Sequence, residues 1–220
     1  MDYKYPTPQL LFKAICNAIR SKTGNSDEIP HQNIPDELDS IIIDEEEYNI
    51  EMQRFIDIIE GTSFINDRIT TVKNRLFSNC TSLTTINLPE CTTLCYQAFM
   101  NCTNLVTVDL PKCTTIEYNA FTSCTSLTTV NLPECTSIGN TAFAGCTNLT
   151  TIILSNNQVV TLRNINAFNN SPIKNGIGYV YVPDNLVDSY KSDTNWSTYA
   201  NQIKPLSELP SNLKEEYGYD

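Results

Sequence analysis

The residues best suited to chemistry are nine cysteines, because a thiol can bind a metal, form a disulfide or act as a nucleophile. Seven of them recur at a fixed period of 22 residues, in two series displaced from each other by 11. The series are Cys80, Cys102, Cys124 and Cys146, and Cys91, Cys113 and Cys135. Cys16 and Cys95 fall outside both. Equal spacing predicts stacked, buried rows, in which a thiol behaves as a small apolar side chain.

Disulfides and zinc are the two other uses of these thiols. Cysteines of one series in adjacent coils would lie about 4.8 Å apart, one strand spacing, which is within the Cα–Cα range of a disulfide. The start of the chain, Met1–Pro6, has no apolar h-region, so we expect no signal peptide and find no support for an oxidising compartment. Cys91 and Cys95 form a Cys-x-x-x-Cys pair with no second pair or histidine nearby. We therefore predict reduced thiols, no metal site and no cofactor.

Other catalytic constellations are missing from the sequence. His31 is the single histidine and sits in a proline-flanked segment outside the repeats, so a Ser-His-Asp or Cys-His arrangement would have to use it. No phosphate-binding glycine loop, His-Glu-x-x-His pair or dinucleotide fingerprint occurs. Asp109 would need Glu90 or Glu117 beside it to form a carboxylate pair, and no column of acids recurs. We predict no catalytic residues and a protein that is not an enzyme.

Charge and hydropathy exclude further classes of function. The net charge is −11, and residues 1–60 carry 13 acids against 5 bases, whereas residues 61–172 carry 5 of each. No basic stripe exists, which argues against nucleic acid and anionic membranes as partners. No apolar run approaches the roughly 18 residues of a membrane span, so we expect no membrane insertion.

The elements that position the thiols are repeats. Each unit reads Cys-Thr-x-Leu-x-x-Ile/Val-x-Leu-Pro-x-Cys-Thr-x-Leu/Ile-x-x-x-Ala-Phe, and a fixed period of this length is typical of a solenoid. In the unit at 124–143, Val130 and Leu132 share one face of a strand that Pro133 ends, and Ala142-Phe143 pack inside a turn. Columns of Leu and Phe repeat the same positions. A degenerate first unit begins near Gly61, and the last unit, which ends at Ala167-Phe168, is stretched by three residues.

These motifs resemble the BspA-like, treponemal type of bacterial leucine-rich repeat. The resemblance covers about residues 61–170 and implies a β-rich solenoid, a right-handed arc of 22-residue units. It also implies a role in adhesion at the cell surface or outside the cell, as in related proteins of host-associated bacteria.

Two flanks complete the predicted organisation. Residues 1–60 are expected to form a small helical segment, in which Ile15–Gly24 and Ile34–Leu38 resemble N-terminal segments of phage and prophage tail-associated proteins. The acidic run at 44–47 suits a solvated linker or helix start, with a cation site as the alternative. Residues 61–172 form the solenoid, 173–206 a mixed cap in which Trp196 covers the last coil or acts as a binding platform, and 207–220 a frayed tail.

The remaining candidate site is the outward side of the predicted strands, which carries two columns of mostly short polar side chains. They are Thr85, Thr107, Thr129 and Thr151 beside Asn87, Asp109, Asn131 and Ile153. Such an array suits hydrogen bonding to a glycan or an extended peptide, although threonine also simply favours exposed strands. We predict a non-enzymatic binding or adhesion module with a protein or glycan ligand. The alternative is a structural part of a phage or prophage tail, located in the phage particle and assembled through the N-terminal helices.

Overall fold

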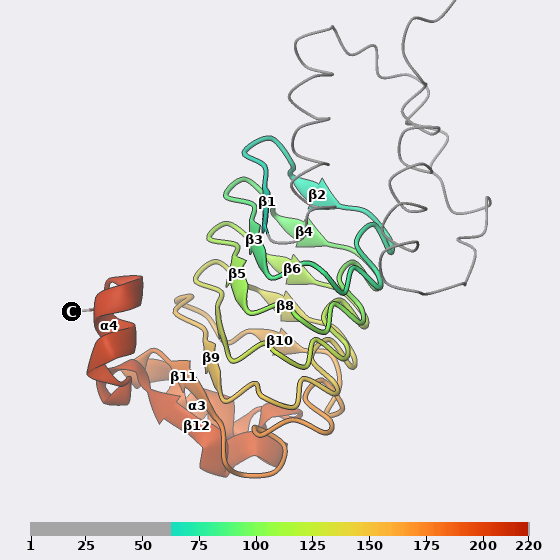
Figure 1. Cartoon of the computed structure of the whole chain (residues 1–220). Helices are drawn as coiled ribbons and strands as arrows, with labels where there is room; N and C mark the ends of the chain where they lie inside the picture. The colour runs from blue at the N-terminus through green and yellow to red at the C-terminus, as the bar shows by residue number, and fades with distance from the viewer. Residues whose placement is uncertain (1–62, 220) are drawn as a thin grey trace, which may run out of the picture.

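A computed structural model describes residues 63–219, which form a stack of coils with two parallel sheets (Figure 1). The first sheet has seven strands, in the order β1 (Ser63–Ile65), β3 (Thr85–Asn87), β5 (Thr107–Asp109), β7 (Thr129–Asn131), β9 (Thr151–Ile153), β11 (Tyr179–Val182) and β12 (Ile203–Pro205). The second has five strands, β10 (Thr161–Leu162), β8 (Ser137–Ile138), β6 (Thr115–Ile116), β4 (Thr93–Leu94) and β2 (Thr71–Val72). Each coil from β1 to β10 contributes one short strand to each sheet, and β11 and β12 extend only the first sheet, so the described residues form a β-rich leucine-rich-repeat solenoid. The predictions for residues 1–62, including the N-terminal helices, lie outside the described part.

The repeat period sets the register of the sheets. Ser63 pairs with Thr85 and Thr85 with Thr107, each 22 residues on. The degenerate first unit is confirmed, because Val72 pairs with Leu94. The last coil is longer. Leu162 pairs with Ile138 at a separation of 24, and the Phe143 amide donates to the Ala167 carbonyl. The extra residues are therefore accommodated in two places, before β10 and in the turn after it.

The core consists of rows of identical side chains along the stack. A row of phenylalanines, Phe77, Phe99, Phe121, Phe143 and Phe168, has nearly parallel rings with centroids 5.1, 5.5, 5.4 and 5.7 Å apart. The thiols of both predicted series are buried beside leucine rows, as expected. Because every coil places the same residue above and below, each side chain finds a neighbour of matching shape.

The tight turns use left-handed backbone at a repeated position. Asn79, Asn101, Ser123 and Gly145 all have φ between 62° and 72°. Asparagine and glycine tolerate this region best, which explains why one of them precedes three of the four cysteines in the series Cys80, Cys102, Cys124 and Cys146. The side chains also link coils, since the Asn101 amide nitrogen donates to the Asn79 side-chain oxygen at 2.9 Å.

The C-terminal residues close the stack through short helices between and after the last two strands. These are η3 (Asp184–Leu186), α3 (Val187–Ser192), η4 (Trp196–Gln202), η5 (Leu206–Glu208) and α4 (Ser211–Tyr217). Trp196 is fully buried, its ring lies 6.0 Å from that of Phe168, and its indole N–H donates to the Val160 carbonyl at 2.7 Å. Trp196 therefore covers the end of the phenylalanine row and is not a binding platform.

The end of the chain differs from the frayed tail that we expected for residues 207–220. Residues 211–217 form α4, Leu209 is buried, and the Tyr219 hydroxyl bonds to the solenoid. The physical reason is a second apolar cluster. Leu209 packs with Ile153 and Tyr181, and Leu213, Tyr217 and Tyr219 lie against them.

Candidate binding face

The outer face of the seven-stranded sheet, which we define as the side directed away from the core, holds all eight predicted site residues. Strand alternation buries the middle residue of each strand, such as Ile86, Val108 and Val130, and turns its neighbours outward. The register aligns the outward residues in two columns. The first column is Ser63, Thr85, Thr107, Thr129, Thr151 and Tyr179; the second is Ile65, Asn87, Asp109, Asn131, Ile153 and Tyr181. The structure thus brings the predicted residues together on one surface.

The first half of this face, over β3 and β5, is open. Thr107 and Asp109 are exposed, and Thr85 and Asn87 are partly exposed. The side-chain oxygen of Asn87 is shielded from water and accepts no hydrogen bond within the described residues. The hydrogen-bonding capacity of this part of the face therefore comes from the exposed side chains of Thr107 and Asp109 and not from the shielded Asn87 oxygen.

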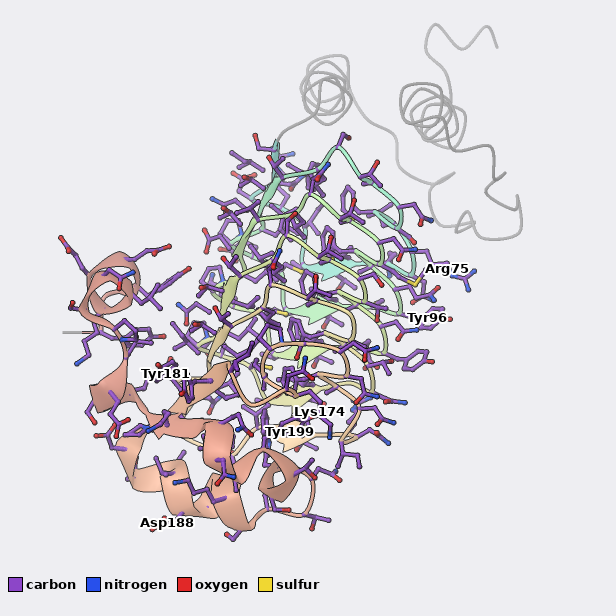
Figure 2. All side chains as sticks on the ribbon, turned by 60° about the horizontal axis from the view of Figure 1, so that its bottom comes forward. Arg75, Tyr96, Lys174, Tyr181, Asp188 and Tyr199 are labelled. Carbon is purple, nitrogen blue, oxygen red and sulfur yellow. The ribbon has the colours of Figure 1, made fainter. Side chains whose placement is uncertain are left out.

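In the second half, the chain itself covers the second column of β9 and β11, whereas Tyr179 in the first column is 37% exposed. Ile153 is fully buried and Tyr181 is 7% exposed, although both point away from the core of the solenoid. Their cover is α4, which Figure 1 shows standing beside the strands, and Figure 2 shows Tyr181 on the side of the solenoid that faces α4. The structure therefore takes Ile153 out of the predicted contact surface.

The sequence of the final segment explains how α4 lies on the face. Leu213 and Tyr217 are four residues apart in α4, so they share one side of the helix, and Leu209 lies two residues before its start. Gly218 has φ 71°, and the Tyr219 amide donates to the Lys214 carbonyl at 2.9 Å, a Schellman end that reverses the chain. The Tyr219 hydroxyl can then pair with both Asn131 and Ser155, at 2.8 Å each. The spacing and the glycine are visible in the sequence, but we predicted a frayed tail for these residues instead of a helix.

The ionisable groups near α4 respond to this packing. Burial, followed by the neighbouring Glu216 carboxylate, raises the pKa of Tyr217 from 10.0 to about 12. Asp109 contributes to the same shift, which places the exposed carboxylate of β5 close to the tyrosine of α4. Tyr217 therefore keeps its hydroxyl proton at physiological pH.

A second exposed aromatic feature lies on the far side of the solenoid. Tyr96 and Tyr118 stack with centroids 5.4 Å apart, and the Arg75 guanidinium lies 5.2 Å from the centre of the Tyr96 ring. Figure 2 shows Arg75 and Tyr96 pointing away from the coils on the side opposite α4. Arg75, Tyr96 and Tyr118 come from three successive coils, so their ring and cation–π contacts stabilise the stacking of these coils.

Within residues 63–219, no group of three His, Cys, Asp or Glu side chains lies close enough together to hold a metal ion. The thiols of Cys91, Cys95, Cys102, Cys113, Cys124, Cys135 and Cys146 are not in disulfides. In the same range, no helix has the length and apolar character needed to cross a membrane.

Comparisons with known proteins agree with the repeat architecture. The BspA type leucine rich repeat region matches residues 70–187 in six copies, just over half of the chain. A T. pallidum leucine-rich repeat protein has a similar fold, with a TM-score of 0.51 and 22% identity over 73% of this chain and 83% of its own.

Two further crystal structures align less well. A leucine rich cell surface protein from Faecalibacterium prausnitzii gives a TM-score of 0.40 and 21% identity over 70% of this chain and 34% of its own. A leucine-rich repeat protein from Bacteroides ovatus gives 0.43 and 24% over 66% and 42%. No curated protein matches the sequence. With six copies of the motif covering most of the solenoid, the chain belongs to the BspA-type leucine-rich repeat family.

Proposed function

We propose that this chain is a non-enzymatic binding module that uses the outer face of its seven-stranded sheet to hold a protein or glycan partner in adhesion. The observation that carries the proposal is the open part of that face, where Thr107 and Asp109 are exposed on a backbone fixed by neighbouring coils. A rigid polar array loses little conformational entropy on binding, which favours recognition of an extended ligand.

The polar character of the columns supports the proposal. Hydroxyl, amide and carboxylate groups recur at the strand spacing of about 4.8 Å, and together they can both donate and accept hydrogen bonds. The exposed Thr107 hydroxyl and the exposed Asp109 carboxylate supply such groups on one strand. The same proposal places the chain at the cell surface or outside the cell, where an adhesive contact would be made.

A binding screen with charge-reversed variants tests this function. The full chain is applied to arrays of host proteins and glycans, and the hits are measured again with Asp109→Lys. We expect at least a tenfold loss of affinity, because the reversed charge stands in the middle of the open face. Glu134→Lys is the matched control, since Glu134 is an exposed acid outside both sheets. Blank arrays at high micromolar concentration, or equal losses in both variants, would contradict the proposal.

A further inference from the structure

We propose that the patch beneath α4 is a docking site for a helical peptide segment of a partner protein, and that residues 209–219 are its resident occupant. We call this patch the α4 site and define it by Asn131, Ile153, Ser155 and Tyr181. The inference rests on the proposed function and names the class of partner for one half of the outer face.

The α4 site is chemically unlike the three strands before it. These strands carry Asn87, Asp109 and Asn131 in the positions that β9 and β11 fill with Ile153 and Tyr181. Two adjacent coils thus present a buried apolar spot, whereas the aliphatic residue at the other end of the column, Ile65, is exposed. The rim of the α4 site is polar, since Asn131 and Ser155 both bind the Tyr219 hydroxyl. An apolar centre with hydrogen-bonding groups at the edge is the usual anatomy of a protein-binding site.

The segment that covers the site is held on the sheet by side chains. The amides of Leu213, Lys214 and Tyr219 donate to the carbonyls of Pro210, Pro210 and Lys214, all within residues 209–219. The contacts of the segment with the solenoid come from side chains, in a cluster separate from the main core and in the two bonds of the Tyr219 hydroxyl. Release of the segment breaks none of these three backbone bonds, so it can open without unfolding the coils.

The occupant seen in the structure defines the partner that would fit. Leu213 and Tyr217 are spaced by one helical turn and lie against Ile153, Tyr181 and Leu209. A tyrosine hydroxyl beyond the helix end reaches the polar rim. A partner helix that presents a leucine and an aromatic residue four apart, followed by a tyrosine, matches the site in the same way.

The experiment measures binding of a fluorescently labelled peptide with the sequence of residues 209–220 to the full chain. In the wild-type chain the resident segment competes with it. The double substitution L213D/Y217D makes the resident segment's buried side polar and opens the site, and we expect it to bind the peptide at least tenfold more tightly than the wild type. S211D/N212D adds the same charge at exposed positions, and we expect it to behave as the wild type.

A second pair of substitutions locates the binding. In the opened variant, Ile153→Asn gives β9 the residue that β7 carries at this place, and we expect peptide binding to be lost. Ile65→Asn makes the same change at the far end of the column, where Ile65 is 56% exposed, and we expect no effect. An opened variant that binds no more tightly than the wild type, or equal effects of the two asparagine substitutions, would overturn the inference. So would a glycan that displaces the peptide, because the site would then recognise sugar.

Hydrogen exchange on the wild-type chain keeps the inference testable if the opened variant fails to fold. We expect the amides of residues 211–217 to exchange at least tenfold faster than those of β7 and β9. Equal exchange would mean that α4 opens only with the solenoid, which would overturn the inference. A ligand sensitive to Asp109→Lys together with a blank peptide assay would leave the proposed function standing alone, so the two failures are distinguishable.

Discussion

At the scale of single residues, the buried thiols combine apolar packing with a directed interaction. The thiols of Cys102, Cys124 and Cys146 each donate to the carbonyl of a phenylalanine in the preceding coil, at 3.0, 3.1 and 3.0 Å. The same carbonyls also accept from the backbone amides of Cys80, Cys102 and Cys124, so each thiol adds a second donor that links one coil to the previous one. Burial raises the pKa of Cys135 and Cys146 from 9.0 to about 12, so these thiols stay protonated in the folded chain.

The raised pKa predicts that alkaline pH lowers the free energy of unfolding. The folded chain holds the protons of these two thiols to about pH 12, whereas the unfolded chain releases them near pH 9.0, so stability is complete below the unfolded pKa and falls as pH rises above it. Urea unfolding between about pH 8 and pH 11 measures the slope, which approaches about 1.4 kcal/mol per pH unit for each such thiol. The Cys135→Ala/Cys146→Ala variant should have a shallower slope. An unchanged slope would contradict the prediction.

Gly139 gives a second prediction at this scale, because its coil passes very close to the previous one. A Cβ at this position would lie 2.6 Å from the Glu117 carbonyl carbon and 2.7 Å from the Tyr118 nitrogen. Gly139→Ala should therefore cost about 1–3 kcal/mol of stability by overpacking. Gly145→Asn is the control, since Asn79 and Asn101 occupy the equivalent left-handed position, and it should change stability by less than about 1 kcal/mol. Urea melts that rank the two variants in the opposite order would refute this explanation.

At the scale of elements, the C-terminal end of the stack is closed by residues outside the repeats. Buried aromatic residues of α3 and η4 close the C-terminal end of the core, where Tyr190 and Trp196 bind the amide and the carbonyl of Val160. The outermost strand on this side, β12, is only three residues long and contains Lys204 and Pro205. Short length, charge and proline are the features that keep a sheet edge from pairing with another chain.

The contacts of Trp196 predict that two substitutions at this position lower the free energy of unfolding by different amounts. Trp196→Phe removes the indole N–H and leaves the buried Val160 carbonyl without its donor, which should cost about 1–3 kcal/mol. Trp196→Ala also leaves a cavity at the end of the phenylalanine row and should cost about 3–5 kcal/mol. Urea unfolding followed by circular dichroism measures both. Tyr179→Phe, at an aromatic residue that is 37% exposed, should stay within about 0.5 kcal/mol of the wild type, and a similar loss there would argue against a specific capping role.

At the scale of the whole molecule, stability is a sum over neighbouring coils. Each coil buries its leucine, cysteine and phenylalanine against the same residues of the next coil, with ladder hydrogen bonds in both sheets. Deleting residues 101–122 removes one full period and should leave a folded solenoid, because every column stays in register. Its urea m-value should fall, since less surface is buried.

Deletion of residues 101–111 is the matched control for register. It removes half a period and places the second cysteine series beneath the first, so we expect no cooperative unfolding transition. Circular dichroism and urea titration compare the two deletions directly. If both variants folded equally well, stacking in register would not be what holds the molecule together.

The period of 22 residues determined the fold of residues 63–172, because it fixes which side chains stack and which point outward. It also placed all eight candidate residues on one face. What the period could not show is the course of the chain after the repeats end. Whether Ile153 is a contact residue or a buried one depends on Leu209, Leu213 and Tyr217, more than fifty residues away. Only the tertiary structure brings that segment back onto β9. The segment is held there by side-chain packing, and it lies outside the sequence repeat that predicts the other contacts.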